Sequence, residues 1–373
     1  GWNFLHEDVL KKANLPAFKK VSVTKKPIEN YCIAPLHVAC INPDTKHLKS
    51  LLEQCDDQGY QDIEGRRCVH YAAACTSTSP LELLLRSSNP NEMDRLKFTP
   101  LMVTAKYNRP ENAKFLIAKG ANVQAKNKLG FAAVHIAAER GNHEVLEVLL
   151  KNGATIDMPG PDRKTALMFA AAQGYMDCLK LLIENGAKVI KKDKCKRTAL
   201  TWAVKNGHTA EASYLLSQGS EYDFPDSSKN YPIHYAAAYG WPECIEVLIQ
   251  AGADINCEND WKLQPLLVAM LKGQVGCVDL LLRKPGIDVN CKDEKGRTLL
   301  SQSVEMLSEE TLSQMEYLLK NCAADPNLPD TDGKTPLHHL CEKGPPVCNL
   351  IGYTEEAKTE WEEEESMKQE KAL

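Results

Sequence analysis

Histidine and cysteine are the residues of this sequence best suited to metal binding or nucleophilic catalysis. The 373 residues include 10 His and 14 Cys, enough for a zinc site or a Cys–His nucleophile pair. However, the sequence contains no Cys-x-x-Cys pair, no nucleophile elbow and no Gly-rich phosphate loop. We therefore predict no catalytic, metal-binding or cofactor-binding residue, with a structural zinc site as the alternative.

The spacing of the histidines indicates a structural repeat. The segment Thr335-Pro336-Leu337-His338 is the fullest form of a short motif whose fourth position recurs along the chain. Successive copies are separated by 33, 32, 33, 33, 33, 33, 33, 34 and 37 residues. The fourth position is occupied by His37, His70, Met102, His135, Met168, Thr201, His234, Leu267, Ser301 and His338. So many copies in one phase exclude a chance arrangement.

The cysteines follow the same phase. Cys178, Cys244 and Cys277 occupy one position of the repeat, and Cys257 and Cys291 share another. A cysteine at a fixed repeat position behaves as a small core residue rather than as half of a disulfide. We therefore predict free thiols in a reducing compartment.

Residues 128–156 show most clearly which elements carry these side chains. One apolar pattern with helical spacing ends at Gly141, and a second runs from Val145 to Leu150 before Gly153-Ala154. Two short helices joined by a glycine turn bury little surface alone, so such a unit needs neighbours.

This unit resembles an ankyrin repeat, with its Thr-Pro-Leu-His start, Ala-rich inner helix, glycine turn, Leu-Leu outer helix and Gly-Ala end. The resemblance implies an all-α solenoid of about ten helix-turn-helix repeats with β-turn finger loops. It also implies that the start-motif histidines tie adjacent loops together by hydrogen bonds. In one repeat Asn108 replaces the turn glycine, and we expect it to adopt the left-handed conformation.

The repeats divide the chain into three parts. We predict an N-terminal capping segment at 1–30, a repeat array at 31–346 and an acidic helical tail or linker at 347–373. For the first part the alternative is a partner-binding helix, and for the tail it is docking onto a basic groove. The longest gap between repeats predicts a lengthened turn around Ser308-Glu309-Glu310.

Charge and hydropathy narrow the classes of partner. The net charge of −5 gives no overall nucleic-acid signature, and no stretch approaches the roughly 20 apolar residues of a membrane span. We predict protein partners, no nucleic acid, no membrane insertion and a monomeric array in the cytoplasm, with cytoskeletal association as an alternative. Because the first residue is Gly rather than Met, we expect the array to be part of a larger protein.

In the ankyrin family, partners bind the finger tips and the exposed face of the inner helices, which together form a concave groove. The positions that match these variable sites are basic in the middle of the array and rich in aromatic residues, which are frequent interface anchors. The candidate protein-binding residues are Phe98, Tyr107, Lys128, Phe131, Arg140, Lys164, Lys194, Arg197, Trp202, Lys205, Tyr239 and Trp261. For Trp202, a core position is equally compatible with the sequence.

These residues predict a non-enzymatic scaffold that binds an acidic or extended protein segment in its groove. Two other functions remain open. The array could be the recognition arm of a larger enzyme, such as a tankyrase-like poly-ADP-ribose polymerase, a ubiquitin ligase, a kinase or a palmitoyltransferase. It could also be an architectural spacer on a cytoskeletal assembly.

Overall fold

The computed structural model describes residues 35–54, 61–305, 315–320, 322 and 324–342. The predicted N-terminal cap, the acidic tail and the lengthened turn at 308–310 lie outside the described residues. The chain divides into two compact units. Unit 1 comprises residues 1–203 and 210–220, and unit 2 comprises residues 204–209 and 221–373.

The described residues form an all-α repeat solenoid, as predicted. Besides α-helices they contain one short 3-10 helix and an isolated bridge between Lys292 and Thr298. The number of repeats, about ten by the sequence, stays a prediction. The helices are α2 (Pro35–Ala39), α3 (Lys46–Gln54), α4 (Cys68–Ala74), α5 (Ser79–Leu84), α6 (Pro100–Tyr107), α7 (Pro110–Ala118), α8 (Ala133–Arg140), α9 (His143–Lys151), η1 (Pro161–Arg163), α10 (Ala166–Gln173), α11 (Met176–Glu184), α12 (Ala199–Lys205), α13 (Thr209–Ser217), α14 (Pro232–Tyr239), α15 (Pro242–Gln250), α16 (Pro265–Leu271), α17 (Val275–Leu282), α18 (Leu299–Glu305) and α20 (Pro336–Glu342).

The ends of the helices follow from local sequence. Thr99 caps α6, and its Oγ1 accepts a hydrogen bond from the Met102 N–H at 3.4 Å. Helix α8 ends at Gly141, which has φ of 72°. Asn108 ends α6 with φ of 52° and ψ of 64°, which confirms the left-handed conformation expected where Asn replaces glycine.

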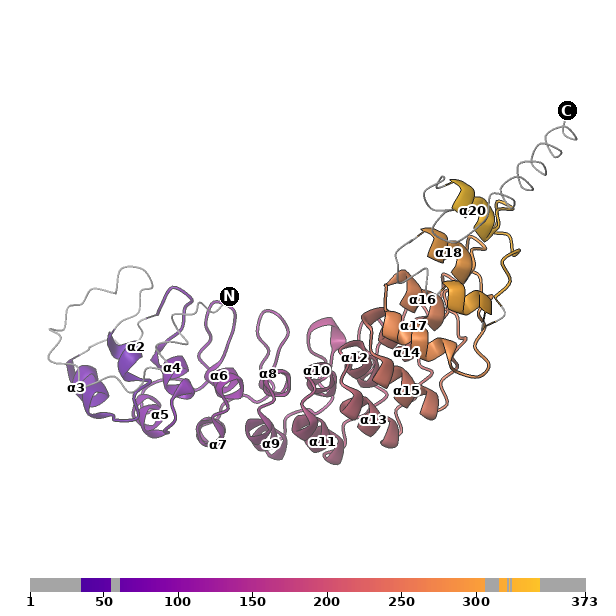
Figure 1. Ribbon diagram of the computed structural model, residues 1–373. Helices are drawn as coiled ribbons and strands as arrows, with labels where there is room; N and C mark the ends of the chain where they lie inside the picture. The colour runs from indigo at the N-terminus through magenta and orange to yellow at the C-terminus, as the bar shows by residue number, and fades with distance from the viewer. Residues whose placement is uncertain (1–34, 55–60, 306–314, 321, 323, 343–373) are drawn as a thin grey trace, which may run out of the picture. The chain divides into compact units, whose positions relative to one another are not determined.

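Inner helices pack on inner helices, and outer helices pack on outer ones. In unit 1, α4, α6, α8 and α10 stack in chain order, and α7, α9 and α11 form a parallel row (Figure 1). In unit 2, α14, α16, α18 and α20 stack, with α15 against α17. The largest wholly buried side chains of the outer helices are leucines such as Leu146, Leu149, Leu179 and Leu182. Each repeat therefore completes its core only with a neighbour.

The start-motif histidines join adjacent loops, as the resemblance implies. His135 Nδ1 accepts from the Ala132 N–H at 3.0 Å, and Nε2 donates to the Met158 carbonyl at 2.8 Å. His70 and His234 make the same pair of bonds, to Phe98 and Leu263 carbonyls respectively. Burial lowers the pKa of each of these three histidines to about 4. They are therefore neutral structural groups at pH 7.

The described cysteines are all free thiols. Cys178, Cys244 and Cys277 are buried in the core, and burial raises the pKa of Cys178 to about 12 and that of Cys277 to about 11. Among the described residues, no group of three or more His, Cys, Asp or Glu side chains could hold a metal ion. None of the helices in that part of the chain is long and apolar enough to span a membrane.

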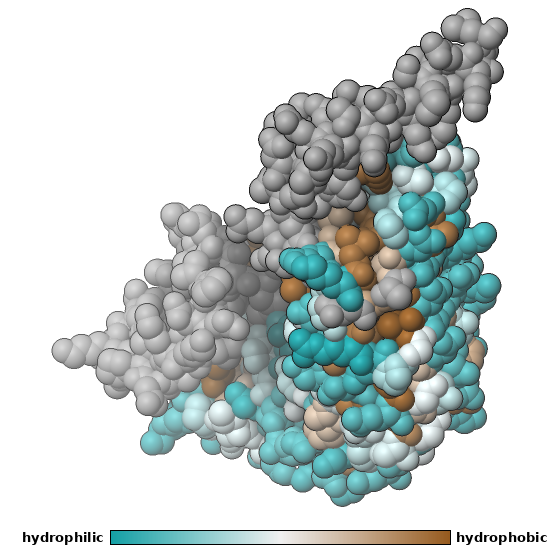
Figure 2. Space-filling model, turned by 45° about the vertical axis from the view of Figure 1, so that its right-hand side comes forward, coloured by the Kyte–Doolittle hydropathy of each residue, from teal (hydrophilic) through white to brown (hydrophobic). Residues whose placement is uncertain are grey.

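Most of the apolar side chains are used in the stacking. On the face drawn in Figure 2, hydrophilic residues predominate and the hydrophobic ones form separate patches. The exposed apolar side chains include Ile63, Leu96, Leu129, Tyr239 and Trp261. Ile63, Leu96, Leu129 and Trp261 lie in finger loops, so these loops carry much of the exposed apolar surface.

Candidate functional site

Most of the described finger loops close around one acidic or amide side chain, and the finger at 160–164, which has Gly160 at this position, is an exception. In the finger at 193–197, Asp193 Oδ1 accepts from the N–H groups of Cys195 (2.8 Å) and Arg197 (2.9 Å). Its Oδ2 accepts from Arg197 Nε at 2.9 Å and from the Trp202 indole Nε1 at 3.2 Å. The Asp193 side chain is fully buried. A carboxylate with four donors holds the finger and the start of the inner helix together.

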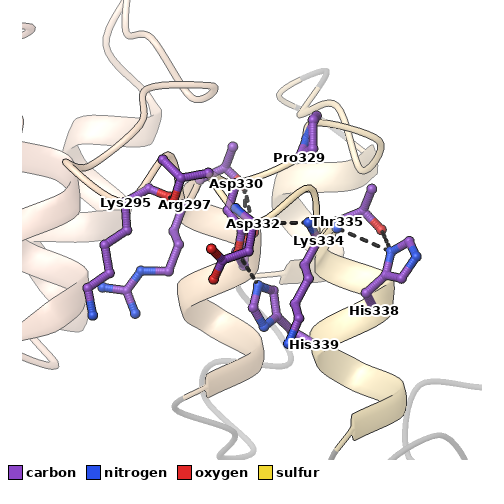
Figure 3. A network of polar contacts seen from close by, with 12 residues as sticks. Lys295, Arg297, Pro329, Asp330, Asp332, Lys334, Thr335, His338 and His339 are labelled. Carbon is purple, nitrogen blue, oxygen red and sulfur yellow. Dashed lines mark hydrogen bonds and ion pairs between the residues drawn. The ribbon is translucent and has the colours of Figure 1, made fainter.

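The same arrangement recurs through both units. Asp62 accepts hydrogen bonds from the main-chain N–H groups of Glu64 and Arg66 in its own finger and from the Tyr71 hydroxyl. In unit 2, Asp330 accepts from the N–H groups of Asp332 and Lys334 and from His339 Nε2 at 2.8 Å (Figure 3). The side chains that reach a finger carboxylate from nine positions later are Tyr71, Trp202, Tyr235, Gln302 and His339.

These contacts favour the ionised form of the carboxylate. Burial by itself would raise the pKa of Asp62, but hydrogen bonds from Tyr71 and Arg66 and the charge of Arg66 outweigh burial and lower the pKa. At Asp330 burial is likewise outweighed, by hydrogen bonds from the Lys334 N–H and from His339, and the pKa is lowered. Asp62 and Asp330 are thus structural anions, whereas at Asp94 burial outweighs the hydrogen bonds from the Phe98 and Leu96 N–H groups and raises the pKa.

Neighbouring fingers are joined by backbone hydrogen bonds. In unit 1 the N–H of Arg95 donates to Glu64 O (2.9 Å), Lys128 to Leu96 O (2.8 Å) and Lys194 to Asp162 O (2.7 Å). The finger that contains Pro161 cannot donate such a bond to the finger of Gly130, because proline has no main-chain N–H. There the fingers still lie close together, because a Cβ built on Gly130 would lie 3.7 Å from Pro161 N.

Five of the residues in and around the predicted site form one aromatic and cationic cluster in unit 1. The Phe131 and Phe169 ring centroids are 5.3 Å apart. Lys164 Nζ lies 5.7 Å from the Phe169 centroid and 3.9 Å from that of Trp202. The Arg197 guanidinium lies 4.3 Å from the Trp202 centroid. We call Phe131, Lys164, Phe169, Arg197 and Trp202 the inner cluster.

The inner cluster is only partly covered. Phe131, Lys164, Arg197 and Trp202 are half-buried, and Phe169 is buried. Lys164 and Arg197 are the two cations of the cluster, and Arg197 is ion-paired with Asp193. Trp202 is half-buried, and a contact of its ring with a partner stays a prediction.

The predicted residues in unit 2 form a smaller group. Lys205 Nζ lies 5.5 Å from the Tyr239 centroid and 6.0 Å from that of Tyr235. Tyr239 is 49% exposed. Trp261 is 47% exposed and lies on a finger, where its main-chain N–H donates to Asn259 Oδ1.

The remaining predicted residues are spread over unit 1. Lys128 and Lys194 are exposed on finger tips, and Arg140 is exposed at the end of α8. Phe98 is half-buried at the base of a finger, and Tyr107 at the end of α6 lies beside Lys106. Whether any of these residues contacts a partner stays a prediction.

Sequence reasoning missed Asp193, Phe169 and Tyr235. A pattern in the sequence could have identified Asp193 and Tyr235, because an acidic residue precedes an aromatic one by nine positions at Asp193–Trp202 and at Asp226–Tyr235. It also did not show that Lys97, Arg163 and Lys196 adopt the left-handed conformation, with φ values of 58°, 61° and 63°.

Comparison with known proteins agrees with this geometry. The family model described as ankyrin repeats (3 copies) matches residues 36–127, 70–160, 101–193, 134–226, 167–259, 219–293 and 266–359. A poly [ADP-ribose] polymerase tankyrase from Caenorhabditis elegans is 38% identical over 117 residues, which are 31% of this chain. That match spans 5% of the tankyrase. Stacked helix pairs, finger loops and histidine ties across most of the sequence, together with the family match, show that this chain belongs to the ankyrin repeat family.

Proposed function

We propose that the array is a protein-interaction scaffold that binds an extended acidic segment of a partner at the inner cluster of unit 1. The observation that carries the proposal is the placement of Lys164 against Trp202, at 3.9 Å, next to the stacked pair Phe131 and Phe169. Aromatic rings and cations that are partly exposed on a rigid scaffold are the usual anchors of a protein interface. An ankyrin array is a non-catalytic interaction fold, and protein partners follow from it.

The partner chemistry follows from the charge of the cluster. Lys164 and Arg197 place two half-buried cations beside the aromatic rings, and Arg197 is ion-paired with Asp193. A partner carboxylate near Lys164 would gain an ion pair in partly desolvated surroundings, and an apolar partner side chain would pack on Phe131. A segment with alternating acidic and apolar residues can make both of these contacts, one with Lys164 and one with Phe131.

The free core thiols suit a reducing compartment, and we propose a cytoplasmic location for the scaffold. An extracellular location would expose these thiols to oxidation. Microscopy of the tagged full chain tests the location.

The test uses the full chain and a fluorescein-labelled peptide of alternating Glu and Leu, long enough at about 16 residues to cross several repeats. We expect Lys164→Gln and Phe131→Ala each to weaken binding, measured by fluorescence anisotropy, by about tenfold. Trp202 and Arg197 are left intact because both hold Asp193. Unchanged affinity in both variants would remove the inner cluster as the binding site.

Lys180→Gln is the matched control. Lys180 is exposed on outer helix α11 and lies 6.0 Å from the Tyr214 centroid, so the variant loses the same charge and the same type of ring contact. It should bind the peptide as tightly as the parent chain. A peptide with Gln in place of Glu should bind neither protein.

A second candidate function is that of a recognition arm in a larger poly-ADP-ribose polymerase. The observation that favours it is the 38% identity to the Caenorhabditis elegans tankyrase over 117 residues. The chain spans only 5% of that protein, so the activity in its name is a proposal for this chain and nothing more.

An antibody raised against the array tests this second function in extracts of the source cells. A cellular protein much longer than 373 residues, whose immunoprecipitate transfers label from labelled NAD, would support it. A cellular protein of the same length as this chain would exclude it. The result does not bear on the scaffold function, which the peptide test decides.

A further inference from the structure

The turn between α4 and α5 in unit 1 differs from the turns that follow it. In the next three helix pairs the inner helix ends in the left-handed region, at Asn108, Gly141 and Gly174. Helix α4 ends instead at Cys75, whose φ of −61° and ψ of 155° are extended. The four residues after it, 76–79, read Thr-Ser-Thr-Ser, and the last of them begins α5. We call residues 76–79 the hydroxyl turn.

Thr76 is the accessible residue of the hydroxyl turn. It is exposed, whereas Ser77, Thr78 and Ser79 are half-buried. The Ser77 hydroxyl donates to Ser79 Oγ at 3.0 Å, and the Thr78 hydroxyl donates to Glu82 Oε1 at 2.8 Å. Within the described part of the chain no hydrogen bond engages the Thr76 hydroxyl. An enzyme that modifies hydroxyl groups can therefore reach Thr76 without breaking a bond.

Arg109, which precedes α7, lies beside the hydroxyl turn. Its Nε donates to the Ala74 carbonyl at 2.9 Å, and Asn112 Nδ2 donates to the Cys75 carbonyl at 2.8 Å. These two donors hold the start of α7 against the end of α4, directly before Thr76. Because consecutive Cα atoms are about 3.8 Å apart, the Cα atoms of Ala74 and Thr76 lie within roughly 8 Å of each other. A group attached to Thr76 can therefore reach the Arg109 guanidinium.

The charge of Arg109 is not needed for the bond that it makes to α4. At the same position of other repeats, Asn142 Nδ2 donates to the Ala105 carbonyl at 2.7 Å and Trp241 Nε1 to the Lys205 carbonyl at 3.1 Å. Both of these side chains are uncharged. The arginine therefore adds a positive charge beyond what the bond to the inner helix requires.

The acidic side chains near Arg109 have other partners. Glu111 pairs with Lys114 at 2.7 Å, and Glu144 accepts a hydrogen bond from Asn108. Arg109 is half-buried and belongs to no ion pair among the described residues. Its charge is thus available to an anion at the hydroxyl turn.

We propose that Thr76 is a phosphorylation site and that its phosphate pairs with Arg109, which joins the hydroxyl turn to the start of α7. A serine/threonine kinase supplies the reaction, with ATP as the donor. The bond between Thr76 Oγ1 and the γ-phosphorus forms as the bond from that phosphorus to the bridging oxygen breaks, ADP leaves, and the hydroxyl proton passes to the kinase base. The site lies outside the inner cluster and does not depend on the proposed peptide binding.

The phosphate adds a link between two helix pairs, because the hydroxyl turn belongs to α4 and α5 and Arg109 precedes α7. It carries a charge of about −1.5 to −2 at pH 7 and three acceptor oxygens, and a guanidinium binds phosphate through two parallel hydrogen bonds. A phosphate on Thr78 would instead lose the bond to Glu82 and place two anions together. The position of the phosphate therefore decides whether it stabilises unit 1.

The full chain with phosphothreonine incorporated at position 76 tests the pairing. We expect its Tm to exceed that of the unmodified chain by about 2–4 °C. The phosphorus NMR resonance should titrate at a lower pH than in a short phosphothreonine peptide of the same sequence, because a nearby guanidinium favours the dianion. In Arg109→Gln both effects of the phosphate should be lost.

Phosphothreonine at position 78 is the matched control. It puts the same group on the same turn, but next to Glu82. Its Tm should be no higher than that of the unmodified chain. An equal rise for the two phosphorylated chains would overturn the pairing, as would a rise for position 76 that persists in Arg109→Gln.

Incubation of the full chain with ATP and an extract of the source cells tests the modification itself. Peptide mass mapping should find phosphate on Thr76, and Thr76→Val, which keeps the branched shape but has no hydroxyl, should lose it. Phosphate found only elsewhere in the chain, or none at all, would overturn the site. These results do not bear on the inner cluster, which the peptide test decides.

Discussion

The indole Nε1 of Trp202 donates a hydrogen bond to Asp193 Oδ2 at 3.2 Å. The same carboxylate oxygen accepts from Arg197 Nε at 2.9 Å. One buried carboxylate therefore orients both a surface cation and the indole ring that this cation covers. The buried Asp193 therefore sets the geometry of the inner cluster.

Removing the carboxylate should cost more than removing either donor. Asp193→Ala leaves Arg197, Trp202 and two backbone N–H groups without their acceptor, and we expect a loss of about 2–4 kcal/mol. Trp202→Phe removes one hydrogen bond and should cost about 1 kcal/mol. Denaturant unfolding of both variants measures the difference. Equal losses would show that the carboxylate does not act as a shared acceptor.

The turn glycines should differ in their tolerance of a methyl group. Gly207 has φ of 77°, and a Cβ there would lie 2.6 Å from Cδ2 of the Trp241 ring. Gly273 has φ of 67° and nothing within 4 Å. Gly273→Ala carries only the strain, about 1 kcal/mol, whereas Gly207→Ala adds a clash and should cost roughly 2–4 kcal/mol.

A double variant identifies the clash. Adding Trp241→Ala to Gly207→Ala should recover part of the extra loss, although it also removes the bond from Trp241 Nε1 to Lys205 O. Thermal unfolding of the two single variants and the double variant gives the coupling. Strict additivity would contradict contact between the ring and the turn.

Acid should destabilise the array through its buried histidines. His70, His135 and His234 have a folded-state pKa of about 4 against an ordinary value of 6.5. Between these two pH values the unfolded chain binds more protons than the folded one, so stability falls as pH drops from about 6.5 towards 4. Each histidine should account for roughly 2 kcal/mol between pH 7 and pH 5.

Urea unfolding at the two pH values checks this dependence. His135→Gln should be less stable than the parent at pH 7 but should lose less stability on acidification. His143→Gln is the control, since His143 is exposed. An unchanged pH dependence in His135→Gln would mean that the imidazole is not held neutral by the fold.

Thiol accessibility should report the packing of the repeats. Cys195 is exposed on a finger, whereas Cys178 is fully buried and burial raises its pKa to about 12. Maleimide labelling followed by peptide mass mapping should modify Cys195 faster than Cys178, by on the order of 100-fold or more. Comparable rates in the native protein would be inconsistent with a closed core at α11.

The repeat, its helix pairs and its histidine ties could be predicted because they are periodic. The left-handed Asn108 and the bonds of His135 follow from rules that act within one repeat or between fixed positions of adjacent repeats. Matching the repeats to the family's variable positions identified Phe131 and Lys164, and Trp202 was left open between a core and a contact residue. That match could not show that the three lie against one another or against Phe169.

What the sequence could not show depends on side-chain geometry. Arg197 was predicted as a contact residue, and its pairing with Asp193 requires the finger to fold back on itself. The positive φ of Lys97 and Lys196 is invisible in composition, because lysine has no preference for that region. The aromatic residues of unit 2, including Tyr239 and Trp261, matched the same family positions but belong to a separate compact unit.

Pro161 has a mechanical consequence for unit 1. The loops on either side of it lie close together without sharing a main-chain bond, whereas α8 and α10 remain packed. The side-chain bond from Lys126 Nζ to the Pro159 carbonyl, at 2.6 Å, joins the two loops. Bending at this joint strains side-chain bonds but breaks no main-chain bond between the loops. We therefore expect the curvature of unit 1 to adjust at this joint to partner segments of different width.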